Sequence, residues 1–179
     1  MQTQLIDLTP AELVGALDAL NVPFLAGGAL TTTLAPIPLL KGLARAPEAR
    51  LRSAIIPLVL RHPEFSTETL AVVLELSGAA RVTCECFYTA AVLLQRKYRA
   101  RLSHLFGAQI ALPDWFSAEL RLTFSTDADA GLRALGACHA TLTGLPINWV
   151  GTYLHAAERF IRHCEVEAKW NQQLHRRAA

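Results

Sequence analysis

The segment from residue 79 to residue 107 constrains the fold most, because it contains no proline and its one glycine stands at its end. Residues 82–94 are apolar at nearly every position, which is typical of a helix that is buried on all sides. From residue 95 onward the apolar positions become sparse, and basic residues fill the spaces between them. The sequence therefore predicts a long central helix, over about residues 80–106, that crosses the core at its front end and reaches solvent or a partner at its basic back end.

Helical patterns also account for most of the remaining chain. Thr9-Pro10-Ala11-Glu12 combines a capping box with a proline in the first turn, so it predicts a helix that ends near Asn21. Further helices are predicted from residue 46 with a kink at Pro57, over residues 67–76, over residues 127–142, and from the cap Asn148 to a frayed tail at residues 172–179. We expect an all-α fold, an irregular or orthogonal bundle of about six to eight helices around the central one, in a single domain over residues 1–179.

A long apolar loop separates the first two helical patterns. It runs from Val22 to Pro38 and contains three prolines and a pair of glycines, so regular structure is not expected before about Leu39. Loops of this length are often functional. Burial of this segment by a neighbouring subunit is the competing interpretation.

The composition favours association with another chain. Hydrophobic residues make up 52% of the sequence and charged residues 18%, which indicates a large core, a buried interface, or both. The net charge of +2 does not by itself indicate a nucleic-acid-binding protein. The first residues lack the pattern of a secretory signal, and no segment reads as a membrane span, so we expect a cytoplasmic protein that does not associate with membranes.

The spacing of the cysteines and histidines argues against a metal centre. Cys84 and Cys86 are two positions apart, and on a helix such residues point in directions about 200° apart. The remaining candidates, Cys138-His139 and His163-Cys164, do not complete a known ligand spacing, and the paired Glu-x-x-His motifs of di-iron bundles are absent from the sequence. We therefore expect free, buried thiols and no metal or other cofactor.

Residues 12–30, ELVGALDALNVPFLAGGAL, resemble the opening of the minimal nucleotidyltransferases, which begin with a helix, a strand and a glycine-rich turn. That family places its metal-binding carboxylates after a Gly-Ser, as paired aspartates further along the chain. This sequence has no such pair after a Gly-Ser. The resemblance therefore implies no nucleotidyltransferase activity.

The basic half of the central helix is the most suggestive candidate site. Lys97, Arg101 and His104 are spaced at i, i+4 and i+7, so they form one stripe, with Arg96 and Arg99 beside it. One interpretation is a solvated helix end whose cations suit the helix dipole. The other is a nucleic-acid-binding surface, made by Arg96, Lys97, Arg99 and Arg101 through contacts with phosphates.

The segment Arg99-Ala-Arg-Leu-Ser-His104 also resembles the Arg-x4-His motif of HEPN domains, which are helical and of which many are RNA endonucleases that act as dimers. The resemblance implies that Arg99 holds the scissile phosphate and that His104 acts as a general acid or base. Ala100 stands where those motifs usually have a polar residue. Five positions on a helix also place the two side chains about 140° apart, so a bend or a dimer cleft would have to bring them together.

Three functions remain open at this point. The leading hypothesis is a non-enzymatic helical interaction or regulatory protein that acts in a complex or homo-oligomer, as a component of a toxin–antitoxin or defence-type module. The first alternative is a HEPN-like RNA endonuclease that uses Arg99 and His104. The second is a nucleic-acid-binding accessory subunit that uses the same basic helix end without cleaving its ligand.

Overall fold

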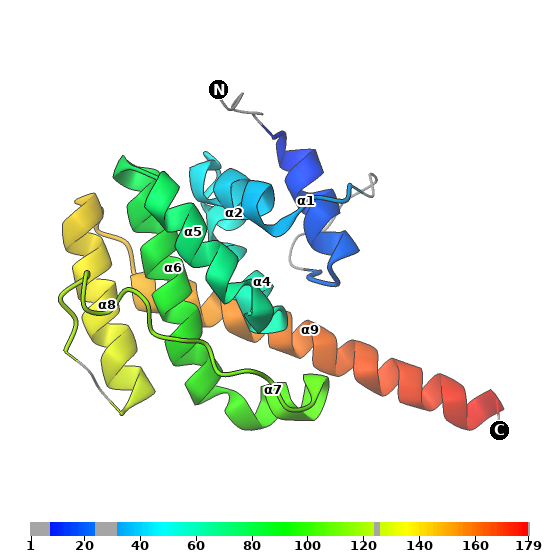
Figure 1. The fold of residues 1–179 in the computed structure, drawn as a ribbon. Helices are drawn as coiled ribbons and strands as arrows, with labels where there is room; N and C mark the ends of the chain where they lie inside the picture. The colour runs from blue at the N-terminus through cyan, green and yellow to red at the C-terminus, as the bar shows by residue number, and fades with distance from the viewer. Residues whose placement is uncertain (1–7, 24–31, 124–125, 179) are drawn as a thin grey trace.

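The computed structural model describes residues 8–23, 32–123 and 126–178, and within these ranges the chain forms α-helices and one 3-10 turn but no β-strand (Figure 1). The elements are α1 (Pro10–Ala19), α2 (Pro36–Arg45), α3 (Ala49–Ser53), α4 (Ile55–Arg61), η1 (Pro63–Phe65), α5 (Ser66–Glu75), α6 (Gly78–Lys97), α7 (Arg99–Phe106), α8 (Ala128–Thr143) and α9 (Trp149–Ala178). The predicted all-α helical bundle is confirmed.

Helix α6 lies at the centre of the bundle. Every residue from Thr83 to Leu94 is buried, as the apolar pattern predicts. Helix α8 lies along one side of α6, and α4 and α9 pack against other parts of its surface (Figure 1). The approach of α8 is close because Gly131 has no side chain, and a Cβ atom there would lie only 2.8 Å from Cδ2 of Leu93.

The predicted central helix is two helices in the structure. Helix α6 ends at Lys97 and α7 begins at Arg99, with Tyr98 between them at φ −101° and ψ 18°. The sequence has no proline or glycine at this point to mark the break. Its physical basis is tertiary packing, because α7 turns away from α6 toward α9, where the ring of Phe106 stacks on that of Phe160 (Figure 1).

The N-terminal part of the chain contains one helix that was not predicted, and others whose boundaries differ from expectation. The capping box of Thr9 and Glu12 is present and starts α1 as predicted. Helix α2 was not predicted: it begins at Pro36, two residues before the end expected for the apolar loop, and ends at Arg45, just before the helix expected from residue 46. Residues 24–31 of that loop lie outside the described ranges. The chain is interrupted at Ala54, between α3 and α4, one turn before Pro57, because Pro57 has no N–H to donate to the carbonyl oxygen of Ser53.

Helix α9 crosses the bundle and then continues past it (Figure 1). It begins as predicted after Asn148, whose Oδ1 accepts a hydrogen bond from the Gly151 amide at 2.9 Å. It continues to Ala178, so the tail that was predicted to fray is helical in the structure. Within the described ranges, no helix has the length and apolar character needed to cross a bilayer.

Candidate functional site

Two of the four cations predicted to bind nucleic acid form ion pairs with acidic residues of neighbouring helices. Nζ of Lys97 lies 2.6 Å from Oδ1 of Asp129 on α8. Arg101 donates hydrogen bonds from Nε and Nη2 to Glu165 and from Nη1 to Glu158, both on α9, at distances of 2.8 to 3.0 Å. Any phosphate that approaches Lys97 or Arg101 therefore competes with a carboxylate that is already bound.

The pairs of Arg101 also change the titration of their partners. Hydrogen bonds from Arg101 lower the pKa of Glu165 below its ordinary value. Burial raises the pKa of Glu158, but the hydrogen bonds from Arg101 and from the Tyr98 hydroxyl outweigh it, so the net shift is downward. The break at Tyr98 thus places α7 where one arginine joins it to two turns of α9.

Arg99 and His104 are both exposed on α7, and the described contacts do not bring them together. They lie near opposite ends of this eight-residue helix, five positions apart, so they face directions about 140° apart. Arg96 is exposed at the end of α6. The catalytic role of Arg99 and His104 and the nucleic-acid-binding role of the basic residues stay predictions.

The cysteines are free thiols, as expected. Cys84 and Cys86 are buried in α6, and burial raises the pKa of the Cys84 thiol to about 12. Cys138 and Cys164 are half-buried. Among the described residues, no three His, Cys, Asp or Glu side chains come close enough to one another to hold a metal ion.

A buried aromatic box joins α8 to the start of α9 and includes His139. The imidazole stacks on Trp149 with 3.6 Å between ring centroids, and its Nδ1 lies 2.6 Å from the hydroxyl oxygen of Tyr153. Phe87 of α6 closes the box edge-on against these rings. Burial lowers the pKa of His139 to about 4. The imidazole is therefore neutral near pH 7, and its position in the core favours a structural role.

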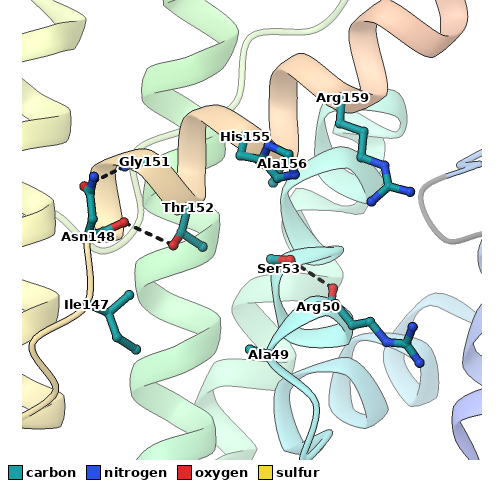
Figure 2. A pocket seen from close by; sticks show the side chains of 10 residues that line it. All are labelled: Ala49, Arg50, Ser53, Ile147, Asn148, Gly151, Thr152, His155, Ala156 and Arg159. Atoms are coloured by element: carbon teal, nitrogen blue, oxygen red, sulfur yellow. Dashed lines mark hydrogen bonds between the residues drawn. The ribbon is translucent and has the colours of Figure 1, made fainter.

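A groove of about 610 Å³ lies between α3 and the N-terminal half of α9, and Figure 2 shows the residues that line it. This volume falls within the range of small-molecule sites. The groove is open because its walls carry small side chains where the two helices face each other. These residues are Ala49 and Ser53 of α3 and Gly151, Thr152 and Ala156 of α9.

The charged lining of this groove is basic. Arg50 of α3 and Arg159 of α9 lie on the same side of it, both exposed, and His155 lies one turn before Arg159 (Figure 2). No aspartate or glutamate is among the residues described as lining it. The groove therefore favours a negatively charged group.

Sequence reasoning missed this groove. Nothing in the sequence connects Arg50 with Arg159, which is far away along the chain. The sequence does indicate which residues of α9 share the face that lines the groove, because they recur at intervals of three and four. These are positions 148, 151, 152, 155, 156 and 159.

The C-terminal half of α9, residues 162–178, begins against α7, where Glu165 binds Arg101, and after this contact extends beyond the bundle (Figure 1). Every residue from Lys169 to Leu174 is exposed. Three of the exposed side chains in this half are large and apolar, and their spacing of four residues places them along one face: Val166 at 50%, Trp170 at 64% and Leu174 at 56% exposure. We call these three residues the apolar stripe.

No family model matches the sequence, and no curated protein or solved structure is significantly similar to it. The resemblances to HEPN domains and to the opening of nucleotidyltransferases therefore stay predictions. The surfaces described above are the basis for the functional inference.

Proposed function

We propose that this chain is a non-enzymatic α-helical interaction protein that self-associates through the apolar stripe of α9. The supporting observation is the exposure of Trp170 between Val166 and Leu174 on a helix that has left the bundle. Tryptophan dominates the binding energy of many protein interfaces, because its large ring buries much area at a low cost in side-chain entropy.

The charges around the stripe favour a second copy of the same chain in an antiparallel arrangement. Glu167 lies beside the start of the stripe, with Lys169 two positions later, and Arg176 lies near the end of the helix. A parallel pair would place Glu167 beside Glu167 and Arg176 beside Arg176, whereas an antiparallel pair brings Glu167 of one copy toward the end of the other helix that carries Arg176. With Trp170 at the centre, Val166 of one copy then faces Leu174 of the other.

The stripe is short, which sets the expected strength of the interaction. Its residues, from Val166 to Leu174, span about 12 Å of helix. Interfaces of this size belong to the small, transient class, so we expect a dissociation constant in about the micromolar range. Reversible association of this kind suits a regulatory component of a complex.

Sedimentation velocity of the full chain over a range of concentrations tests this proposal. We expect a monomer–dimer equilibrium in the wild type, and a dissociation constant at least about tenfold weaker in Trp170→Ala. Trp115→Ala is the matched control, because Trp115 is 39% exposed and lies outside α9. A wild type that stays monomeric at high micromolar concentration, or equal weakening in both variants, would contradict the proposal.

Charge reversal tests the antiparallel arrangement. Glu167→Lys and Arg176→Glu should each weaken the dimer, and the double variant should recover most of the loss. Within one helix these residues are nine positions apart, so roughly 13 Å along the axis, and their coupling must arise between copies. Absence of recovery in the double variant would exclude the antiparallel pairing.

The HEPN-like endonuclease is a second candidate, supported by the exposure of Arg99 and His104 on α7. Helix α7 packs on α9 just before the stripe, so an antiparallel dimer would place the tail of one copy beside α7 of the other. The test is cleavage of single-stranded RNA by the full chain, with loss expected in both Arg99→Ala and His104→Ala. Salt-sensitive RNA binding that His104→Ala leaves unchanged would instead support an accessory subunit that binds without cleavage.

The finer assignment to a toxin–antitoxin or defence-type module also stays a proposal. The self-association surface is compatible with it, because such modules depend on reversible contacts between small chains. The identity of the neighbouring genes and of proteins recovered with the full chain would test it.

A further inference from the structure

The groove between α3 and α9 presents two guanidinium groups to the same side. Arg50 comes from α3 and Arg159 from the third turn of α9, and Figure 2 shows both side chains on one side of the hollow. A planar guanidinium group matches two oxygens of a phosphate through paired, charge-assisted hydrogen bonds. His155, one turn before Arg159 on α9, adds a ring nitrogen to the lining. This end is therefore suited to a phosphate group.

The hydroxyl groups of the groove offer acceptors rather than donors. Ser53 Oγ donates its proton to the carbonyl oxygen of Arg50 at 2.9 Å, and Thr152 Oγ1 donates to the carbonyl oxygen of Asn148 at 3.1 Å (Figure 2). Each hydroxyl oxygen keeps lone pairs that can accept a hydrogen bond. A ligand that satisfies them must carry donors of its own, as the hydroxyl groups of a sugar do.

We propose that this groove binds a small phosphate ester that carries hydroxyl groups, of the sugar-phosphate or nucleoside-monophosphate class. The phosphate lies against Arg50 and Arg159, and the hydroxyl groups donate to Ser53 and Thr152. The remaining lining includes Ile147, which gives an apolar surface for the carbon skeleton or for a base. The groove involves the opposite end of α9 from the apolar stripe, so failure of either proposal leaves the other intact.

Isothermal titration calorimetry of the full chain at constant salt tests the ligand class. The probes are ribose 5-phosphate, AMP, ribose and inorganic phosphate. We expect each ester to bind more tightly than ribose or phosphate alone, because only the esters engage both ends of the groove. Tighter binding of ribose 5-phosphate assigns the groove to sugar phosphates, and tighter binding of AMP assigns it to nucleoside monophosphates.

Arginine variants test the phosphate end. Arg50→Ala and Arg159→Ala should each weaken ribose 5-phosphate binding by about tenfold. Arg162→Ala is the matched control, because it removes the same charge from an exposed position on the same helix that does not line the groove. Ala49→Trp should abolish binding without a change in charge, because Ala49 is an exposed lining residue that a large ring would extend into the groove.

Thr152→Val tests the hydroxyl end of the groove by comparing two ligands, since a loss of folding would weaken the binding of both. It should reduce the affinity for ribose 5-phosphate toward that for inorganic phosphate and leave the affinity for inorganic phosphate unchanged. Circular dichroism checks that each variant is folded. The proposal is overturned if neither ester binds, if inorganic phosphate binds as tightly as the esters, or if Arg162→Ala weakens binding as much as Arg159→Ala.

Discussion

The two halves of α9 belong to one helix but have opposite surroundings. Residues 149–161 pack against α3, α4, α6 and α8, and Tyr153, Phe160 and Ile161 are fully buried. Residues 162–178 leave the bundle after Glu165, which Arg101 of α7 binds, and their three large apolar side chains are exposed. Both halves carry apolar residues at helical spacing, so that spacing identifies a face that can be buried but not the molecule that buries it. The N-terminal half of α9 is buried by other helices of its own chain, whereas we propose that a second copy of the chain buries the C-terminal half.

The two halves should differ most in how much stability is lost when a large apolar side chain is truncated to alanine. Phe160 is fully buried and stacks on Phe106 with 6.0 Å between ring centroids. Phe160→Ala should lower the free energy of unfolding by about 3–5 kcal/mol, because it loses apolar burial and leaves a cavity. Urea denaturation measures the effect, with Val166→Ala in the exposed half as control. A cost below about 1 kcal/mol for Phe160→Ala would mean that α9 is not held in the bundle as described.

The aromatic box should make the buried half sensitive to pH. His139 has an ordinary pKa of 6.5 that burial lowers to about 4 in the folded chain, so the unfolded chain binds a proton first as pH falls. The resulting stability is fully present above about pH 6.5 and is lost between that pH and about 4, to a total of about 3 kcal/mol. Urea denaturation across this range measures it, and His139→Gln should flatten the curve whereas His104→Gln should not. An unchanged slope in His139→Gln would contradict the lowered pKa.

Arg101 holds α7 against α9 near the boundary between the two halves. Its loss should change the free energy of unfolding by an intermediate amount. Arg101→Ala should lower the free energy of unfolding by about 1–2 kcal/mol at pH 7, since it removes several charge-assisted hydrogen bonds to Glu158 and Glu165 at a partly exposed site. Arg99→Ala, on the same helix, is the control and should change stability by less than about 0.5 kcal/mol.

The Arg101 effect also has a predicted pH dependence. Because hydrogen bonds from Arg101 lower the pKa of Glu165, the pair stabilises the fold above the ordinary carboxyl pKa of 4.5 and loses that effect as pH falls through the lower folded value. The difference between wild type and Arg101→Ala should therefore shrink below about pH 4.5. A difference that grows with acidity would exclude this ion pair as its source.

Sequence patterns predicted a helix well where neighbouring residues in the sequence determine it. Thr9 and Asn148 cap the helices that they precede, and the apolar run of α6 is buried throughout. The break at Tyr98 could not be predicted, because it follows from how α7 packs on α9 and not from a proline or glycine. The same break lets Arg101 reach Glu165 across two helices, whereas the i, i+4 spacing of Glu165 and Lys169 in the sequence indicates only a local pair.

The candidate sites divide in the same way. The apolar stripe can be read from the spacing of Val166, Trp170 and Leu174, although part of it falls in a tail whose polar composition predicted fraying. The groove cannot be read from any one segment, because Arg50 and Arg159 meet only after α3 and α9 have packed together. A local pattern reports which residues share a helix face, and tertiary structure decides which faces meet.

Trp170→Ala should have the smallest effect on stability, and it best separates the two halves of α9. Trp170→Ala should change the free energy of unfolding by less than about 0.5 kcal/mol when measured at concentrations where the chain is monomeric, because Trp170 is 64% exposed. At higher concentration the two proteins should diverge, since dimer formation by mass action stabilises the folded wild type more than the variant. The melting temperature of the wild type should therefore rise with protein concentration, and that of Trp170→Ala should rise less over the same range. A large loss of stability in the monomeric variant would mean that the C-terminal half of α9 packs on its own bundle, and the two halves would then have the same kind of partner.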